Sequence, residues 1–306
     1  MAFKKDSWLV RGVLIVAVAA FIAVPVAMSL SGNQGGGGAS TAASPSQGTD
    51  RATQLEGEIK GYTAVLGREP NNQTALRGII DAKAELGDLA GTVEPLERLA
   101  ELNPTVPEYS IILAQTKQQL DDAEGAAQIY RRVLTQVPGN VQALEGLVQL
   151  LVTQDRTEAA VGLLRDTLAT ADQSNELNPG SVDKLSVKLL LGQVFVEQKK
   201  YDDALKIYDE TIAEAQAASP SQPDFRPTLA KALVLKEKGD DAAAQPLFDE
   251  ALAMAPVQYK DAVQQLISEN TAPAAEPEAV EGETQGVGET ADVEAESDES
   301  DAPVAP

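Results

Sequence analysis

Between residues 51 and 270, apolar side chains recur every three or four positions, and no β-branched run alternates with a period of two. This pattern is typical of amphipathic helices and not of strands. Pro70, Pro104 and Pro138 interrupt it at equal intervals. The pattern therefore predicts an all-α region of short helices that repeat at a constant period.

A large apolar residue stands eight positions before each of these prolines, and the series continues beyond them. Its six members, here called the anchors, are Tyr62, Leu96, Tyr130, Leu164, Tyr208 and Phe248. Small residues lie four positions before five of them: Thr92, Ala126, Ala160, Ala204 and Ala244. This pattern resembles the second helix of the tetratricopeptide repeat, a helix–turn–helix unit of about 34 residues. Leu113-Ala114 and Leu191-Gly192 resemble the large–small pair of its first helix.

The resemblance implies a right-handed solenoid of antiparallel helix pairs over residues 51–270, with about five full repeats. Arg51–Arg68 is predicted as an unpaired leading helix, and Tyr259–Glu269 as a solvating cap helix. The first four anchors are evenly spaced at the period of the repeat, whereas the last two intervals are longer. These two intervals are interpreted as loop insertions between repeats, within Asp172–Ser181 and Ala217–Pro223.

A narrower resemblance involves the sequence Asp224-Phe225-Arg226-Pro227 and the helix pair that follows it. It is similar to membrane-associated tetratricopeptide proteins of cyanobacteria and plastids, of the Slow Green type. That resemblance implies a role in membrane biogenesis or in the assembly of pigment–protein complexes.

The amino-terminal segment, residues 1–30, is predicted to hold a single transmembrane anchor. Gly12–Leu30 carries no charge, and its length as a helix is about 28 Å, close to the ~30 Å of a bilayer core. A cleaved signal peptide fits the same residues. Because Lys4, Lys5 and Arg11 lie on its amino-terminal side, the positive-inside rule puts the amino terminus in the cytoplasm or stroma and the repeats on the periplasmic or lumenal side.

Two further segments have compositions that do not favour folding. Residues 31–50 contain Gly35–Gly38 with Ala, Ser, Thr and Pro, and are predicted to be a flexible linker. Residues 271–306 carry eleven acidic residues and no basic one, and are predicted to be a disordered tail. The tail is interpreted either as a solubility device or as a polyanion that binds a basic partner or competes for the chain's own binding face.

The composition excludes several kinds of chemistry. The chain has 47 acidic and 24 basic residues, for a net charge of −23, and it lacks both cysteine and histidine. Zinc fingers, cysteine nucleophiles and Ser-His-Asp triads are therefore excluded, and nucleic-acid binding is disfavoured. The sequence predicts no enzyme, no cofactor and no metal site. The carboxylate pairs Asp121/Asp122, Asp202/Asp203 and Asp240/Asp241 are interpreted as occupants of turns that cap helices.

The candidate site is the concave face that the first helices of the repeats would line, and its expected ligand is a protein or peptide. Placing the helices by the anchors puts nine polar side chains there: Arg77, Asp81, Gln115, Gln118, Gln142, Glu145, Gln149, Gln193 and Arg226. Gln115, Gln149 and Gln193 take the same place in three successive repeats, so their amides form a ladder suited to an extended backbone. The alternative is that these are ordinary solvated positions.

Charge on this face argues against an acidic peptide ligand, since Arg77 and Arg226 lie at opposite ends with Gln and Glu between them. An apolar edge is the second docking candidate, with packing between helices as its alternative. Its members are Ile111, Ile112, Leu189, Leu190 and Leu229.

The sequence thus predicts a membrane-anchored scaffold for protein–protein interaction, acting in the assembly of membrane protein complexes. A translocon-associated periplasmic chaperone is the alternative with the same topology. An enzyme with a carboxylate-only site is the remote one.

Overall fold

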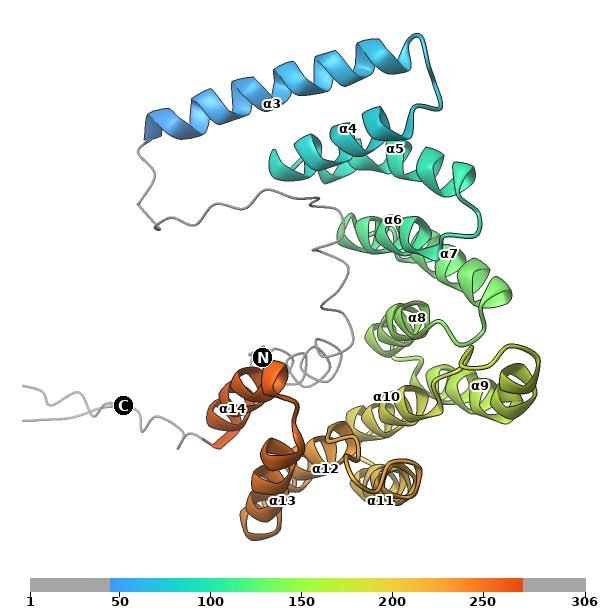
Figure 1. Ribbon diagram of the computed structural model, residues 1–306, viewed down its shortest axis with the longest axis vertical. Coiled ribbons are helices and arrows are strands. Elements are labelled where there is room, and N and C mark those ends of the chain that lie inside the picture. The colour runs from blue at the N-terminus through green and yellow to red at the C-terminus, as the bar shows by residue number, and fades with distance from the viewer. Residues whose placement is uncertain (1–44, 272–306) are drawn as a thin grey trace, which may run out of the picture. The chain divides into compact units, whose positions relative to one another are not determined.

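The computed structural model describes residues 45–271, and within them it contains twelve α-helices and no strand (Figure 1). The helices are α3 (Pro45–Leu66), α4 (Gln73–Glu85), α5 (Leu89–Leu102), α6 (Pro107–Gln119), α7 (Ala123–Gln136), α8 (Val141–Thr153), α9 (Thr157–Leu177), α10 (Lys184–Glu197), α11 (Tyr201–Ala218), α12 (Arg226–Glu237), α13 (Asp241–Met254) and α14 (Val257–Thr271).

Each helix packs on the next, which gives five pairs from α4/α5 to α12/α13, preceded by α3 and followed by α14. The first helices of successive pairs also touch: α6 contacts α8, α8 contacts α10, and α10 contacts α12. One side of the array is therefore made of first helices. The predicted all-α array of helix pairs is confirmed for the described residues.

The turn inside each pair has a recurring backbone geometry. One residue adopts a positive φ in every pair: Gly87, Asp121, Asp155, Lys199 and Gly239. The intervals between these five positions equal the intervals between the last five anchors, including the two longer ones. In three of the five pairs the next residue is an aspartate, Asp88, Asp122 or Asp240, whose side chain accepts a hydrogen bond from the second helix. The aspartate cap satisfies a backbone donor that the helix itself leaves free.

The anchors lie in the apolar core of the array. All of them except the partly buried Tyr62 are at most 2 % exposed, and so are the small residues four positions before them. Tyr62, Tyr130 and Tyr208 each pack their ring over a glycine of a first helix, at Gly78, Gly146 and Gly192. The aromatic ring thus fills the space that the missing side chain leaves, as close helix packing requires.

Three predictions are corrected. The insertion at Asp172–Ser181 is not a loop for most of its length, because α9 continues as helix to Leu177. The leading helix is not unpaired: α3 packs on α4 and extends from Pro45, inside the range predicted as linker. The pair Asp202/Asp203 lies in the first turn of α11 and not in the preceding turn.

The apolar edge proposed as a docking surface is wrong as well. Ile111, Leu189, Leu190 and Leu229 are buried, and Ile112 packs against the core that contains the first three of them. The packing alternative is the correct one, because the helices packed on α6, α10 and α12 cover these side chains.

No helix in the described part of the chain is both long and apolar enough to cross a bilayer. The predicted anchor, residues 12–30, lies outside that part, as do the acidic residues 276–301 and most of the predicted linker.

Candidate partner-binding face

All nine predicted site residues lie on first helices: two on α4, two on α6, three on α8, and one each on α10 and α12. The amide ladder has one residue on each of three consecutive first helices, with Gln115 on α6, Gln149 on α8 and Gln193 on α10. Exposure falls along the ladder, since Gln115 is exposed, Gln149 is partly buried and Gln193 is 6 % exposed. A ligand can therefore reach the α6 and α8 amides more easily than the α10 amide.

Gln193 is buried because α10 is surrounded. Helices α8, α9, α11 and α12 all pack on it, and every residue from Leu189 to Val196 is buried. Its side-chain nitrogen Nε2 has no hydrogen-bond partner. A buried amide donor without an acceptor is uncommon and destabilising, by about 1–3 kcal/mol.

Three amide side chains of the face are free to bind a ligand. Gln115, Gln142 and Gln149 make no hydrogen bond to another described residue, whereas Gln118 accepts one from the Tyr130 hydroxyl at 3.4 Å. An amide offers two donors and one acceptor. The exposed ends of these side chains on α6 and α8 can thus hydrogen-bond a peptide backbone.

Glu145 lies at the centre of the face, on α8 between Gln142 and Gln149. A narrow groove of about 10 Å³ separates α8 from α10 beside it. The groove is lined by Glu145, Val148, Gln149, Val152, Leu190, Gln193, Val194 and Glu197. Burial raises the pKa of Glu145 to about 7. Burial, helped by the nearby Glu145 carboxylate, raises the pKa of Tyr130 to about 12.

The two arginines of the face are engaged within the protein. The Arg77 guanidinium lies 5.7 Å from the centre of the Tyr109 ring, within cation–π range. Burial raises the pKa of Asp81, one helical turn further along α4, and the charge of Arg77 opposes that shift. At the other end Arg226 is held by Asp224, with Nη2 2.8 Å from Oδ2, and its Nη1 donates to the Ser186 hydroxyl at 3.2 Å.

Because a carboxylate already occupies Arg226, this end of the face does not offer a free cation to an acidic peptide. The expectation that the face disfavours acidic ligands stays a prediction, with which the pairing of Arg226 agrees. Sequence spacing placed the arginine on the face but did not identify its partner, although Asp224 is only two positions away.

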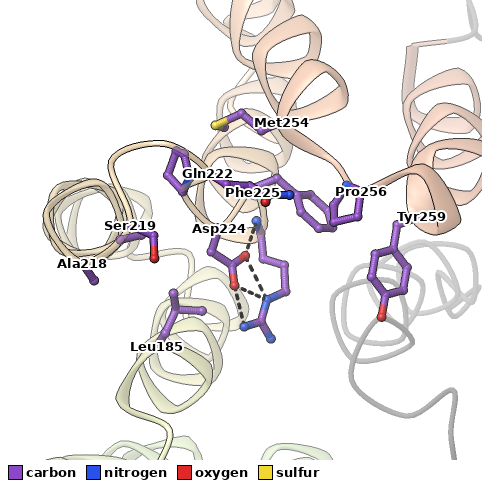
Figure 2. A pocket seen from close by; sticks show the side chains of 12 residues that line it. Leu185, Ala218, Ser219, Gln222, Asp224, Phe225, Met254, Pro256 and Tyr259 are labelled. Atoms are coloured by element: carbon purple, nitrogen blue, oxygen red, sulfur yellow. Dashed lines mark hydrogen bonds and ion pairs between the residues drawn. The ribbon is translucent and has the colours of Figure 1, made fainter.

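A pocket of about 510 Å³ adjoins Arg226 and was not predicted (Figure 2). It is lined by Leu185, Ala215, Ala218, Ser219, Gln222, Pro223, Asp224, Phe225, Arg226, Met254, Pro256 and Tyr259. The hydrogen bonds of Asp224 appear as dashed lines in Figure 2, and the Phe225 and Tyr259 rings lie with centroids 6.1 Å apart. In the sequence, the only sign of this pocket is the pair of proline-containing segments that join α11 to α12 and α13 to α14.

Among the described residues no group of three or more Asp and Glu side chains is arranged to hold a metal ion. The pairs proposed as helix caps behave as such where Asp122 and Asp240 accept backbone hydrogen bonds from Gly125 and Ala243. Together, the side chains described above give the face amide groups that can hydrogen-bond a ligand, the Glu145 carboxylate, which no cation of the described residues pairs with, and the apolar walls of the groove.

Comparison with known proteins gives a family match for part of the chain. Residues 118–178, which run from the end of α6 through α9, match the family model for the tetratricopeptide repeat. Comparison with functionally characterised proteins gave no match.

Several solved structures are similar in part. A protein from Parabacteroides merdae, described as a tetratricopeptide repeat protein, is 16 % identical over 72 % of this chain and 79 % of its own, with a TM-score of 0.45. The MamA protein is 18 % identical over 67 % of this chain and 98 % of its own, with a TM-score of 0.38. YrrB, described as a tetratricopeptide protein with an unusual peptide-binding site, is 12 % identical over 69 % of this chain and 99 % of its own, with a TM-score of 0.37.

Residues 118–178 are thus similar to the tetratricopeptide repeat, and the helix pairs on both sides of them repeat the same turn and anchor geometry.

Proposed function

We propose that this protein is a membrane-tethered scaffold whose first-helix face, formed by α4, α6, α8, α10 and α12, binds an extended segment of a partner protein. The observation that carries the proposal is the set of unpaired amides on adjacent helices, Gln115 on α6 and Gln142 and Gln149 on α8. Helices that contact one another present these groups on one side, so a single peptide backbone can bridge them.

The membrane part of the proposal rests on sequence. The uncharged residues 12–30 are the expected anchor, and the basic residues before them favour export of the repeats. An anchored scaffold of this topology fits the assembly or biogenesis of membrane protein complexes. The resemblance to Slow Green-type proteins favours photosynthetic membranes.

Affinity capture with variants of the full chain tests the binding face. The face variant carries Gln115→Ala, Gln142→Ala and Gln149→Ala. A matched control carries Gln136→Ala, Gln216→Ala and Gln264→Ala, which are exposed glutamines on α7, α11 and α14. Proteins recovered from native membranes by the wild type and the control, but lost from the face variant at equal helicity, would support the proposal.

Partners captured equally by both variants would refute the face as the binding surface. Recovery of translocon subunits instead of subunits of another membrane complex would favour the chaperone role predicted as the alternative. Protease accessibility of residues 51–270 in sealed and opened membrane vesicles tests the orientation, and release of the intact chain from membranes by alkaline carbonate would refute the anchor.

A further inference from the structure

We propose that the first-helix face at Glu145, beside the groove between α8 and α10, binds a lysine or arginine side chain of the partner protein, with the Glu145 carboxylate as its counter-ion. This inference rests on the proposed function and adds to it the chemical class of the ligand. It makes the partner segment basic, where the amide ladder alone would accept any extended backbone.

The first observation is that Glu145 lacks a counter-ion. It forms no hydrogen bond and no ion pair with another described residue, and α8 itself contains no lysine or arginine. The lysines of the two adjoining first helices are engaged elsewhere. Lys117 of α6 pairs with Asp122 and Glu97, and the lysines of α10 pair with Asp172 and Glu214.

The second observation is independent and concerns α10. Gln193 lines the same groove from the other side, is 6 % exposed, and its Nε2 donor is unpartnered. A carbonyl oxygen of a bound segment would satisfy this donor after a small shift of the groove walls, since the groove holds only about 10 Å³. An unpaired acceptor and an unpaired buried donor thus meet in one groove.

The groove, with about 10 Å³ of space, is too narrow to take a basic side chain, so the aliphatic stem would lie over its apolar mouth. Val148 and Val152 of α8 face Leu190 and Val194 of α10 across it. Lysine and arginine bury their methylene groups along such apolar surfaces while the charged end reaches a polar partner. The charged end would lie at Glu145.

The net negative charge of the repeat region also favours a basic ligand. Residues 51–270 contain 34 acidic and 21 basic residues, and the arginine at the α12 end of the face is neutralised by Asp224. A phosphate or an acidic peptide would meet repulsion at Glu145 with no free cation beside it. A divalent cation is disfavoured because no group of three carboxylates surrounds the groove among the described residues.

A two-step experiment tests the inference on the full chain. First, a random decapeptide library displayed on phage is selected on the wild-type protein. Second, the best peptide is synthesised and titrated against the wild type, Glu145→Gln and Glu210→Gln. Glu210 is an exposed residue of α11, away from the first helices, so its variant has the same change in net charge.

The expected result is a common lysine or arginine among the selected peptides. Glu145→Gln should weaken the synthetic peptide about tenfold, and Glu210→Gln less than twofold. Replacing the peptide's basic residue by norleucine should weaken binding to the wild type by a similar factor, with no further loss on Glu145→Gln.

Other outcomes separate this inference from the proposed function. Peptides that lack a common basic residue, yet lose binding to the Gln115, Gln142 and Gln149 triple variant, would overturn the inference and leave the binding face standing. Equal losses for Glu145→Gln and Glu210→Gln would also overturn it. Failure to recover any binding peptide, or binding unaffected by the triple variant, would overturn both.

Discussion

The ring of Tyr130 on α7 lies directly over Gly146 on α8, so that a Cβ atom added at Gly146 would come within 3.0 Å of the Tyr130 Cζ atom. The tyrosine is the anchor of one repeat, and the glycine belongs to the first helix of the next. This contact joins two repeats, and a stacked array depends on such contacts between neighbours.

Gly146→Ala should therefore destabilise the protein in spite of the higher helix propensity of alanine. Overpacking of a well-filled core typically costs about 1–3 kcal/mol. Gly162→Ala on α9, where an added Cβ meets nothing within 4 Å, is the control and should stabilise by about 0.5–1 kcal/mol. Urea unfolding measures both. A Gly146→Ala protein as stable as the wild type would mean that the ring is not held in place.

A smaller side chain at anchor position 130 should reduce the loss of stability that Gly146→Ala causes. Leu96 is the anchor one repeat earlier, and Ile112 stands in the same relation to it as Gly146 does to Tyr130. Combining Tyr130→Leu with Gly146→Ala should therefore be less destabilising than the sum of the two single changes, by about 1 kcal/mol or more. Strict additivity in urea unfolding would contradict a direct steric contact.

Glu145 should make stability depend on pH. Burial raises its pKa from 4.5 to about 7, so the folded state binds more protons than the unfolded state between these values. The free energy of unfolding should then fall as the pH rises from about 4.5 through 7, and level off above. Because the side chain is only partly buried, the contribution is about 1–2 kcal/mol.

Denaturant titrations at pH 5 and pH 8 check this sign. Glu145→Gln should remove the part of the fall due to this residue and be more stable than the wild type at pH 8. Glu210→Gln should keep the wild-type slope. A Glu145→Gln protein that loses stability equally at both pH values would point to a lost native contact.

Binding of a basic peptide should release protons near neutral pH. A cation beside Glu145 favours the ionised carboxylate, which is about half populated at pH 7. About half a proton should be released per peptide at pH 7, and affinity should rise up to about tenfold between pH 6 and pH 8. Calorimetry in buffers of different ionisation enthalpy measures the released protons. Tyr130 and Glu197 are the other ionisable groups near this carboxylate, and Glu145→Gln separates their contribution.

Lys199 should be a site of strain in the turn between α10 and α11. Its φ is 57°, in the left-handed region that two other pairs fill with Gly87 and Gly239. Lys199→Gly should raise the free energy of unfolding by up to about 1 kcal/mol. The adjacent Lys200 has a φ of −86°, so Lys200→Gly should give no such gain. Thermal unfolding of the two variants makes the comparison.

Much of the fold was readable from local sequence. The anchors, the small residues before them and their regular period are set by how one helix hairpin must pack on the next, and the longer intervals recur unchanged in the turns at Asp155, Lys199 and Gly239. Contacts with other parts of the chain, however, carried α9 on to Leu177, where composition had suggested a loop: Ala171 is fully buried, and the Asn175 side chain hydrogen-bonds the backbone of Val182.

The sequence by itself determined the repeat, the helix pairs and which side chains belong to first helices, because those properties depend on spacing along the chain. Only the tertiary structure decided whether each of these side chains is buried and whether it has a charged partner. Gln193 and Gln115 hold equivalent places, yet one is buried because four helices surround α10 and the other is exposed. Glu145 is uncompensated because the lysines of α6 and α10 pair elsewhere. Burial and charge pairing are set by neighbours distant in sequence, and spacing does not record them.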